Sequence, residues 1–163
     1  MLTIRKAEIK DLHAITEIYN QAVLRTTATF DTTTKTVEEQ RDWYDKHGPK
    51  YPILVVQEDS KVIGWASLSA ASDRCAYSGT AEGSIYIDSE CQGKGVGKKL
   101  GAAIMKAGKE AGLHTVILKI AEGNEASMKL AKSLGFMKIG VMKEVGKKFG
   151  KFLDVTMLQL IYD

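Results

Sequence analysis

The chain has 163 residues, of which 44% are hydrophobic and 26% charged, and these proportions exclude the disordered, low-complexity and collagen-like classes. Its 23 basic and 20 acidic residues give a net charge of +3, too small an excess to indicate a nucleic-acid partner. No apolar run approaches the ~18–20 residues of a membrane-spanning helix, so we expect no membrane association. The length predicts one domain, residues 1–163, with a substantial core.

The two cysteines, Cys75 and Cys91, have neither the spacing of a zinc site nor the number of a disulfide framework. The three histidines are far apart in the sequence, so we expect no metal. The segment 1–6 lacks the apolar stretch and cleavage site of a secretory signal. We therefore expect a cytoplasmic protein without a leader.

The N-terminal part of the chain predicts a strand, a helix and a loop. Residues 2–7 alternate as a short strand, and Asp11 is a candidate cap for a helix that ends near Arg25. The Thr-rich segment 26–36 follows. Its β-branched, polar composition disfavours a helix and predicts a loop.

The next part predicts a second helix and a hairpin. Thr36 and Glu39 form a capping-box pattern, and the helix that they open should end by Gly48. Residues 53–58 and 61–68 flank two residues of turn type, which indicates a β-hairpin.

The remaining chain alternates strands and helices, a pattern typical of an α/β domain built around one sheet. The expected elements are a strand at 80–88, a helix at 94–111, a strand at 115–121, a helix at 124–134, and strands at 136–142 and 153–161.

A glycine-rich segment, QGKGVGKK at 92–99, lies between the strand at 80–88 and the helix that follows it. Glycines bring backbone N–H groups close to a ligand, and a helix N-terminus adds partial positive charge, so the segment is a candidate phosphate site. Such turns also serve purely structural purposes. The P-loop pattern would need glycine in place of Gln92, and the dinucleotide pattern would need it in place of Lys98.

The spacing Gln/Arg-x-x-Gly-x-Gly does fit residues 92–97, and it resembles the pyrophosphate loop of the GNAT superfamily of N-acetyltransferases. Residues 124–136, an Asn-initiated helix ending in Gly-Phe, resemble the second signature of that family. Residues 74–77 and 80–87 are similar to its phosphinothricin and methionine sulfone (sulfoximine) acetyltransferase branch. The resemblance covers essentially the whole chain.

The resemblance implies a GNAT α/β fold with a mixed, mostly antiparallel sheet, helices on both faces, and two strands splayed around acetyl-CoA. Its implied cofactor contacts are Ile85, Tyr86 and Ile87 for pantetheine, Gly93, Lys94, Gly95, Val96, Gly97 and Lys98 for pyrophosphate, and Asn124 and Ser133. From the residues alone, Asn124 is equally an ordinary helix N-cap and Ser133 a solvated helix residue.

Glu82 is the candidate general base, since it corresponds to the carboxylate with that role in the branch. Strand interiors disfavour Glu, and this one stands alone among small residues, which favours a function. The alternative is an edge-strand carboxylate paired with Arg74.

The sequence departs from the family at Ala131, where many members carry a tyrosine that protonates the CoA thiolate. Alanine cannot do this, which leaves Tyr86 or water for the role. Cys91 next to the glycine loop suggests an acyl-enzyme, but no histidine adjoins it, and we interpret it as a buried or incidental thiol.

On the acceptor side, the resemblance implies contacts from Phe30, Arg74, Cys75, Ala76, Glu82, Gly83 and Ser84. Arg74 is a candidate clamp for a carboxylate, with a solvated loop arginine as the alternative. Phe30 is a candidate substrate-side aromatic or a core contact. Residues 148–154 resemble a hairpin that serves dimerisation in the branch, so a homodimer is expected.

The sequence thus predicts an acetyl-CoA-dependent N-acetyltransferase that acts on the α-amine of a small amino-acid-like molecule by direct transfer. A protein N-terminus or a polyamine is the alternative acceptor. A non-catalytic acyl-CoA-binding module is the alternative of another class, supported by Ala131 and opposed by Glu82.

Overall fold

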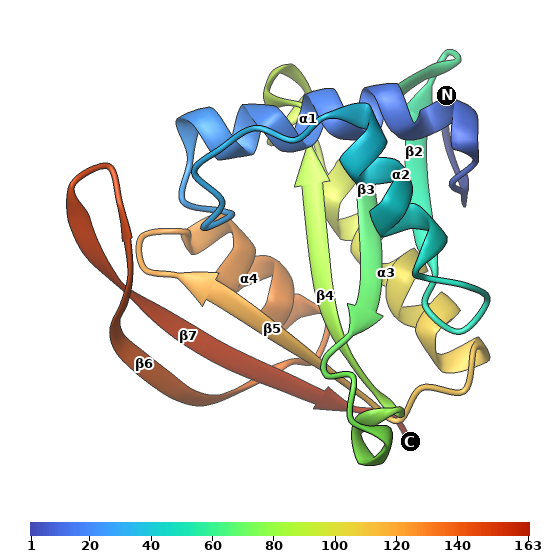
Figure 1. Cartoon of the computed structure of the whole chain (residues 1–163). Coiled ribbons are helices and arrows are strands. Elements are labelled where there is room, and N and C mark those ends of the chain that lie inside the picture. The colour runs from blue at the N-terminus through green and yellow to red at the C-terminus, as the bar shows by residue number, and fades with distance from the viewer.

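The computed structural model describes residues 1–163 and contains one seven-stranded sheet with helices on both faces (Figure 1). The strands are β1 (Leu2–Lys6), β2 (Ile53–Glu58), β3 (Lys61–Ala70), β4 (Thr80–Ile87), β5 (Thr115–Ala121), β6 (Met137–Lys148) and β7 (Lys151–Ile161). The α-helices are α1 (Leu12–Arg25), α2 (Val37–Asp45), α3 (Val96–Glu110) and α4 (Glu125–Ser133). None of them is both long and apolar enough to cross a bilayer.

The strand order is β1-β2-β3-β4-β5-β7-β6, and every neighbouring pair is antiparallel except β4 and β5. The expected mixed, mostly antiparallel sheet is therefore confirmed. Helices α1 and α2 cover one face of β2–β4, and α3 covers the other (Figure 1).

The core lies in two layers because successive side chains of a strand point to opposite faces of the sheet. On the α1 face, Trp65 is buried in one cluster with Ile15. On the α3 face, Leu68 is buried in a second cluster with Leu100. Each large apolar side chain buried in this way contributes about 1.5–3 kcal/mol. These two layers hold β3 and β4, and hence the centre of the sheet, in place.

The start of α2 follows its sequence signal. Thr36 Oγ1 accepts a hydrogen bond from the Glu39 backbone N–H at 3.1 Å, and the Glu39 carboxylate accepts one from the Thr36 N–H at 2.8 Å. The helix ends at Asp45, a turn before Gly48. The predicted capping box is confirmed.

The start of α1 is at the predicted position, but Asp11 does not cap it. Arg5 donates two hydrogen bonds to the Asp11 carboxylate, at 2.7 and 2.9 Å, and the Glu8 backbone N–H donates a third at 2.8 Å. Burial alone would raise the pKa of Asp11, but these bonds outweigh it and leave the pKa lowered. Asp11 therefore ties β1 to the turn before α1.

The last two strands are longer than the predicted 136–142 and 153–161. β6 continues to Lys148 and β7 begins at Lys151, joined by Phe149 and Gly150. Both turn residues have positive φ, 52° and 75°, which matches the twist of a tight hairpin. The lysine-rich stretch gave no apolar alternation because β6 is an edge strand whose side chains are mostly exposed.

The decisive feature of the sheet is a fork between its two parallel strands. β4 and β5 pair only from Thr80 to Glu82, and beyond that β4 stays with β3 while β5 stays with β7. Gly83 is the first residue past the fork, and a Cβ on it would lie 2.8 Å from Leu118 of β5. The missing side chain thus leaves room for Leu118 where the strands part. The predicted splay is present.

Candidate active site

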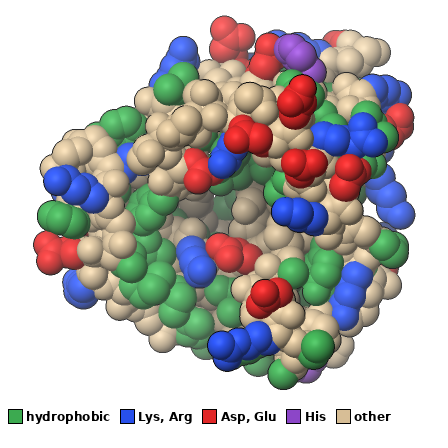
Figure 2. All heavy atoms as spheres, viewed as in Figure 1, with side chains coloured by type: hydrophobic (Ala, Val, Ile, Leu, Met, Phe, Trp, Pro, Cys, Tyr) green, Lys and Arg blue, Asp and Glu red, His purple; other side chains and the backbone are tan.

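Two connected cavities open along the fork, and the surface is hollowed there (Figure 2). The first, of about 350 Å³, lies between β4, β5, α4 and the loop after α1, and is here called the fork cavity. The second, of about 850 Å³, lies between the end of α1, the glycine-rich loop and α4, and is called the loop cavity. Ile85, Tyr86 and Asn124 line both, so the two form one cleft.

The glycine-rich loop has the geometry of an anion site. Gly93 and Gly95 have φ of 76° and 79°, a left-handed conformation that side chains rarely adopt, with open space around each Cα. α3 begins at Val96, directly after Gly95, so the unpaired N–H groups of its first turn face the loop. Gly93, Val96, Gly97 and Lys98 line the loop cavity. Lys94 and Gly95 are exposed and line neither cavity, so Gly95 acts through the conformation of the turn.

The side wall of the cleft is the edge of β4. Residues Ile85, Tyr86 and Ile87 line the loop cavity, and beyond Glu82 this strand has no partner on its β5 side. The Gln92 side-chain amide donates to the Ile87 carbonyl at 3.1 Å, which ties the glycine loop to the end of β4. Such an unpaired edge can accept an extended amide-containing ligand as an additional strand.

Helix α4 forms the opposite wall. Asn124 Oδ1 accepts from the Ser127 backbone N–H at 3.2 Å, so its N-cap role is confirmed. Ser133 Oγ donates to the Leu130 carbonyl at 2.7 Å and lines the loop cavity. Ala131 is buried, lines the fork cavity and presents only a methyl group there.

The loop after α1 forms the roof of the fork cavity and is held by side chains from three elements. The Tyr19 hydroxyl of α1 lies 2.8 Å from Thr29 Oγ1 and also donates to Asp31. The Tyr86 hydroxyl of β4 donates to the Ala28 carbonyl at 3.5 Å. Lys148 of β6 donates to the Thr29 carbonyl at 2.8 Å.

Phe30 lies against the backbone of β6. A Cβ on Gly146 would overlap the Phe30 ring, so the aromatic side chain takes this place because position 146 is glycine. Phe30 is 37% exposed and lines the fork cavity.

The groups that hold the roof are shifted in pKa by burial. It raises the pKa of Tyr86 to about 12 and also raises that of Tyr19, so both phenols stay protonated donors at neutral pH. Burial lowers the pKa of Lys148, while the charge of Asp31 opposes that effect. The two tyrosine rings meet edge to face, with centroids 5.2 Å apart. The roof is therefore a packed structure and not a free loop.

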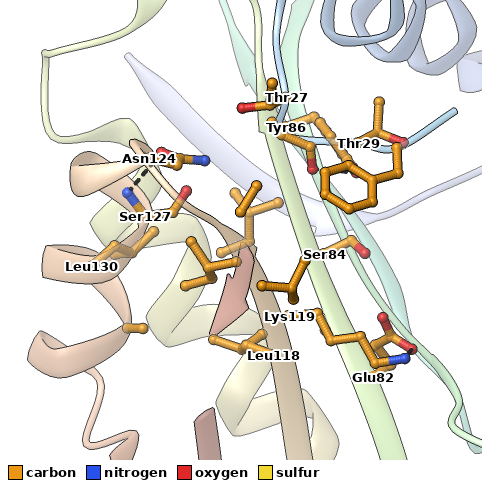
Figure 3. A pocket seen from close by; sticks show the side chains of 18 of the residues that line it. Thr27, Thr29, Glu82, Ser84, Tyr86, Leu118, Lys119, Asn124, Ser127 and Leu130 are labelled. Carbon is orange, nitrogen blue, oxygen red and sulfur yellow. Dashed lines mark hydrogen bonds and ion pairs between the residues drawn. The ribbon is translucent and has the colours of Figure 1, made fainter. Parts of the chain in front are cut away.

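Glu82 sits at the last rung before the fork, opposite Ser69 of β3 and Ile117 of β5. Its strand is central, so the edge-strand alternative is wrong. The Glu82 carboxylate pairs with Lys119 of β5 and not with Arg74, and 3.6 Å separate Lys119 Nζ from Glu82 Oε2. Figure 3 shows the two side chains directed toward each other at one end of the fork cavity, near Ser84.

The remaining predicted acceptor residues divide into two groups. Gly83 and Ser84 line the fork cavity. Arg74, Cys75 and Ala76 are exposed, lie at a short 3-10 helix in the connection between β3 and β4, and line neither cavity.

The structure also brings in residues that the sequence analysis did not single out, above all Lys119, Tyr19 and Lys148. Lys119 had a usable signal, because it is a lone charge in the apolar strand TVILKIA, just as Glu82 is in its own strand. No sequence signal marked Lys148, because its contact with Thr29 spans 119 positions of the chain.

Comparison with known proteins places the whole chain in one family. The family model described as acetyltransferase (GNAT) domain matches residues 4–157. The chain is 39% identical to an L-methionine sulfoximine/L-methionine sulfone acetyltransferase of Salmonella typhimurium, over 99% of this chain and 95% of that protein.

Solved structures agree with this. A Salmonella typhimurium acetyltransferase structure with its cofactor acetyl-CoA superposes with a TM-score of 0.96 at 39% identity, over 99% of this chain and 94% of that one. The structure of a phosphinothricin acetyltransferase from Sinorhizobium meliloti in complex with acetyl-CoA superposes with a TM-score of 0.94 at 35% identity. The match covers 98% of this chain and 88% of that one. The fork and the glycine loop of this chain therefore belong to a fold that holds acetyl-CoA in similar proteins.

Proposed function

Because the chain belongs to the GNAT acetyltransferase family and is an N-acetyltransferase, we propose that it acetylates the α-amino group of a small amino-acid-like molecule. The proposed acceptors are of the methionine sulfoximine, methionine sulfone or phosphinothricin type, which are named for similar enzymes. The observation that carries the proposal is the position of Glu82 at the fork, inside a cavity continuous with the loop cavity. Residues 1–163 then form a single catalytic domain.

Acetyl-CoA fits the two halves of this cleft by their chemistry. The pyrophosphate would take the backbone N–H groups of the loop from Gly93 to Lys98 and the N-terminus of α3. The pantetheine amides would pair with the free edge of β4 from Ile85 to Ile87, between that strand and α4. The thioester would then lie in the fork cavity, which Ala131 lines.

Glu82 would act as the general base. An α-amine arrives mostly as ammonium at neutral pH, and the Glu82 carboxylate takes its proton. The free nitrogen attacks the thioester carbonyl carbon, a C–N bond forms, and the C–S bond breaks with its electron pair left on sulfur. No covalent enzyme intermediate is needed, so Cys91 has no part in the reaction.

The departing thiolate receives its proton from the Tyr86 hydroxyl or from water. A thiol of pKa ~8.5 is a good leaving group, so the alanine at position 131 does not prevent the reaction. Tyr86→Phe separates the two donors: a turnover loss beyond about tenfold assigns the role to Tyr86, since a positioned acid contributes about a hundredfold or more.

The test is thiol release from acetyl-CoA with a panel of amines. We expect wild-type activity with methionine sulfone, and Glu82→Gln should lower turnover by ~10²–10⁴-fold while acetyl-CoA still binds. The loss should shrink at high pH, where more of the amine is already deprotonated. Glu58→Gln at the exposed end of β2 is the matched control. Wild-type turnover in Glu82→Gln at neutral pH would show that Glu82 is structural.

The same panel decides between the proposal and its alternatives. A short peptide or a polyamine as the best acceptor would replace the amino-acid proposal with another acceptor class. Binding of acetyl-CoA without thiol release for any amine would favour a non-catalytic module.

We also propose a homodimer formed through the β6–β7 hairpin. Three large apolar side chains of this hairpin are more than half exposed, Phe149 at 63%, Phe152 at 55% and Val145 at 52%, and of these Phe152 lines neither cavity. Phe152→Glu should convert a dimer to a monomer in light scattering, and a monomeric wild type would contradict this.

The two free cysteines fit a reducing compartment, for which we propose the cytoplasm.

A further inference from the structure

The fork cavity contains one pair of opposite charges. Among its 21 lining residues, Glu82 is the only acidic one and Lys119 the only basic one, with 3.6 Å between Lys119 Nζ and Glu82 Oε2. The other lining side chains are apolar or neutral, including the hydroxyls of Thr27, Thr29 and Ser84. The cavity is therefore dipolar, with its negative end on β4 and its positive end on β5 (Figure 3).

No structural role explains why a lysine stands at position 119. Its side chain makes one ion pair, with Glu82, while its backbone belongs to the ladder between β5 and β7. The two side chains are 48% and 38% exposed, and pairs with such exposure contribute at most about 1 kcal/mol to stability. Lys119 lies two residues beyond Ile117, the register partner of Glu82, so it projects from the same face one step further along the fork.

An α-amino acid has the complementary charge pattern. Its ammonium nitrogen and carboxylate carbon are about 2.5 Å apart, fixed by the geometry at Cα. If the ammonium lies at Glu82, where the proposed reaction requires it, the carboxylate is within reach of the charge on β5. The two ion pairs across the ligand then replace the single pair between the side chains, and neither protein charge is left alone.

We propose that Lys119 binds the α-carboxylate of the acceptor and thereby selects amino acids over simple amines. The inference rests on the proposed function and assigns to Lys119 the role that the sequence analysis gave to Arg74, which lines neither cavity. A peptide acceptor has its carboxylate too far from the amine to use this residue, so it gains nothing from it.

The experiment compares methionine sulfone with 3-(methylsulfonyl)propylamine, which is the same molecule without the carboxylate. The measured quantity is the ratio of kcat/KM for the two acceptors. Lys119→Met should lower this ratio by ~10–100-fold, the size of a lost charge-assisted hydrogen bond, mainly by raising KM for the sulfone. Lys119→Arg should restore most of it. Lys138→Met on β6, which makes the same change of charge outside both cavities, is the control.

Each other outcome has a definite meaning. Thiol release by the wild type with neither acceptor overturns the proposed function and this inference with it. If the wild type is active and Lys119→Met leaves the ratio of kcat/KM for the two acceptors unchanged, only the inference is overturned. An equal loss for both acceptors, with an altered pH profile of kcat, would mean that Lys119 acts on Glu82 and not on the carboxylate. A ratio lowered by Arg74→Ala but not by Lys119→Met would return the carboxylate to the loop between β3 and β4.

Discussion

The two halves of the cleft are built in different ways. On one side the loop cavity is bounded by backbone, namely the glycine-rich turn, the N-terminus of α3 and the free edge of β4, and side chains of α1 and α4 close the other side. The fork cavity is bounded by side chains from the loop after α1, β4, β5, α4 and the last hairpin. A site made of backbone groups needs a contiguous run of residues that permit the required backbone conformation, so it leaves a motif in the sequence. A site made of side chains needs only that residues far apart in the sequence come together in the fold.

This difference predicts how each half responds to substitution. Added bulk in the loop cavity should disturb acetyl-CoA and leave the acceptor constants alone. Changes around the fork cavity should do the reverse. Variants that separate the two binding constants therefore test the division directly.

The largest effect is expected in the glycine loop. Gly95→Val should raise the Kd for acetyl-CoA tenfold or more, because φ of 79° costs an L-residue ~1–2 kcal/mol and the loop must change shape to relieve it. Gly112→Val at the other end of α3, where φ is 86°, imposes similar strain far from both cavities. Isothermal titration of both folded proteins is the measurement. An equal Kd in the two variants would remove the loop from acetyl-CoA binding.

A smaller effect, on the other half, is expected at Gly146. Gly146→Ala pushes a methyl group into the Phe30 ring, and overpacking of ~1–3 kcal/mol should raise the acceptor KM roughly three- to tenfold. The Kd for acetyl-CoA should stay as in the wild type. Gly140→Ala in the same strand has open space around its Cβ and serves as the control. If Gly146→Ala changes the acetyl-CoA Kd and not the acceptor KM, the two halves are not separate.

The smallest effect concerns the scaffold that both halves share. His47 Nδ1 lies 2.6 Å from the Trp43 carbonyl and Nε2 lies 2.8 Å from Ser69 Oγ. This arrangement suits the neutral ring, in which Nδ1–H donates to the carbonyl and Nε2 accepts from the hydroxyl. Burial lowers the pKa of His47 below its ordinary 6.5. Below that pH the unfolded chain binds a proton that the folded chain does not.

The stability contributed by neutral His47 is therefore complete above pH 6.5 and declines as the pH falls toward the lowered pKa, by at most ~1.4 kcal/mol per pH unit. Urea unfolding at about pH 7.5 and about pH 5.5 should show this decline in the wild type and a smaller one in His47→Gln. Equal declines would mean that other groups cause it. Both ligand constants at about pH 7.5 should be insensitive to the substitution, since His47 lines neither cavity.

The sequence by itself determined the order of elements and the half of the cleft that is made of backbone. Local rules govern these features: the capping box at Thr36 opens a helix wherever it stands, and a glycine such as Gly95 permits a left-handed turn whatever surrounds it. The lone carboxylate of Glu82 was also visible, because a charge inside a strand conflicts with local propensity.

Only the tertiary structure decided the other half. Lys119 becomes the partner of Glu82 because β4 and β5 stop pairing after three rungs, and that divergence depends on each strand having a second neighbour. Lys148 reaches Thr29 because the turn of the last hairpin lies beside the loop after α1, over a separation of 119 residues (Figure 1). Contacts of this kind follow from packing over the whole chain, so no local pattern of residues records them.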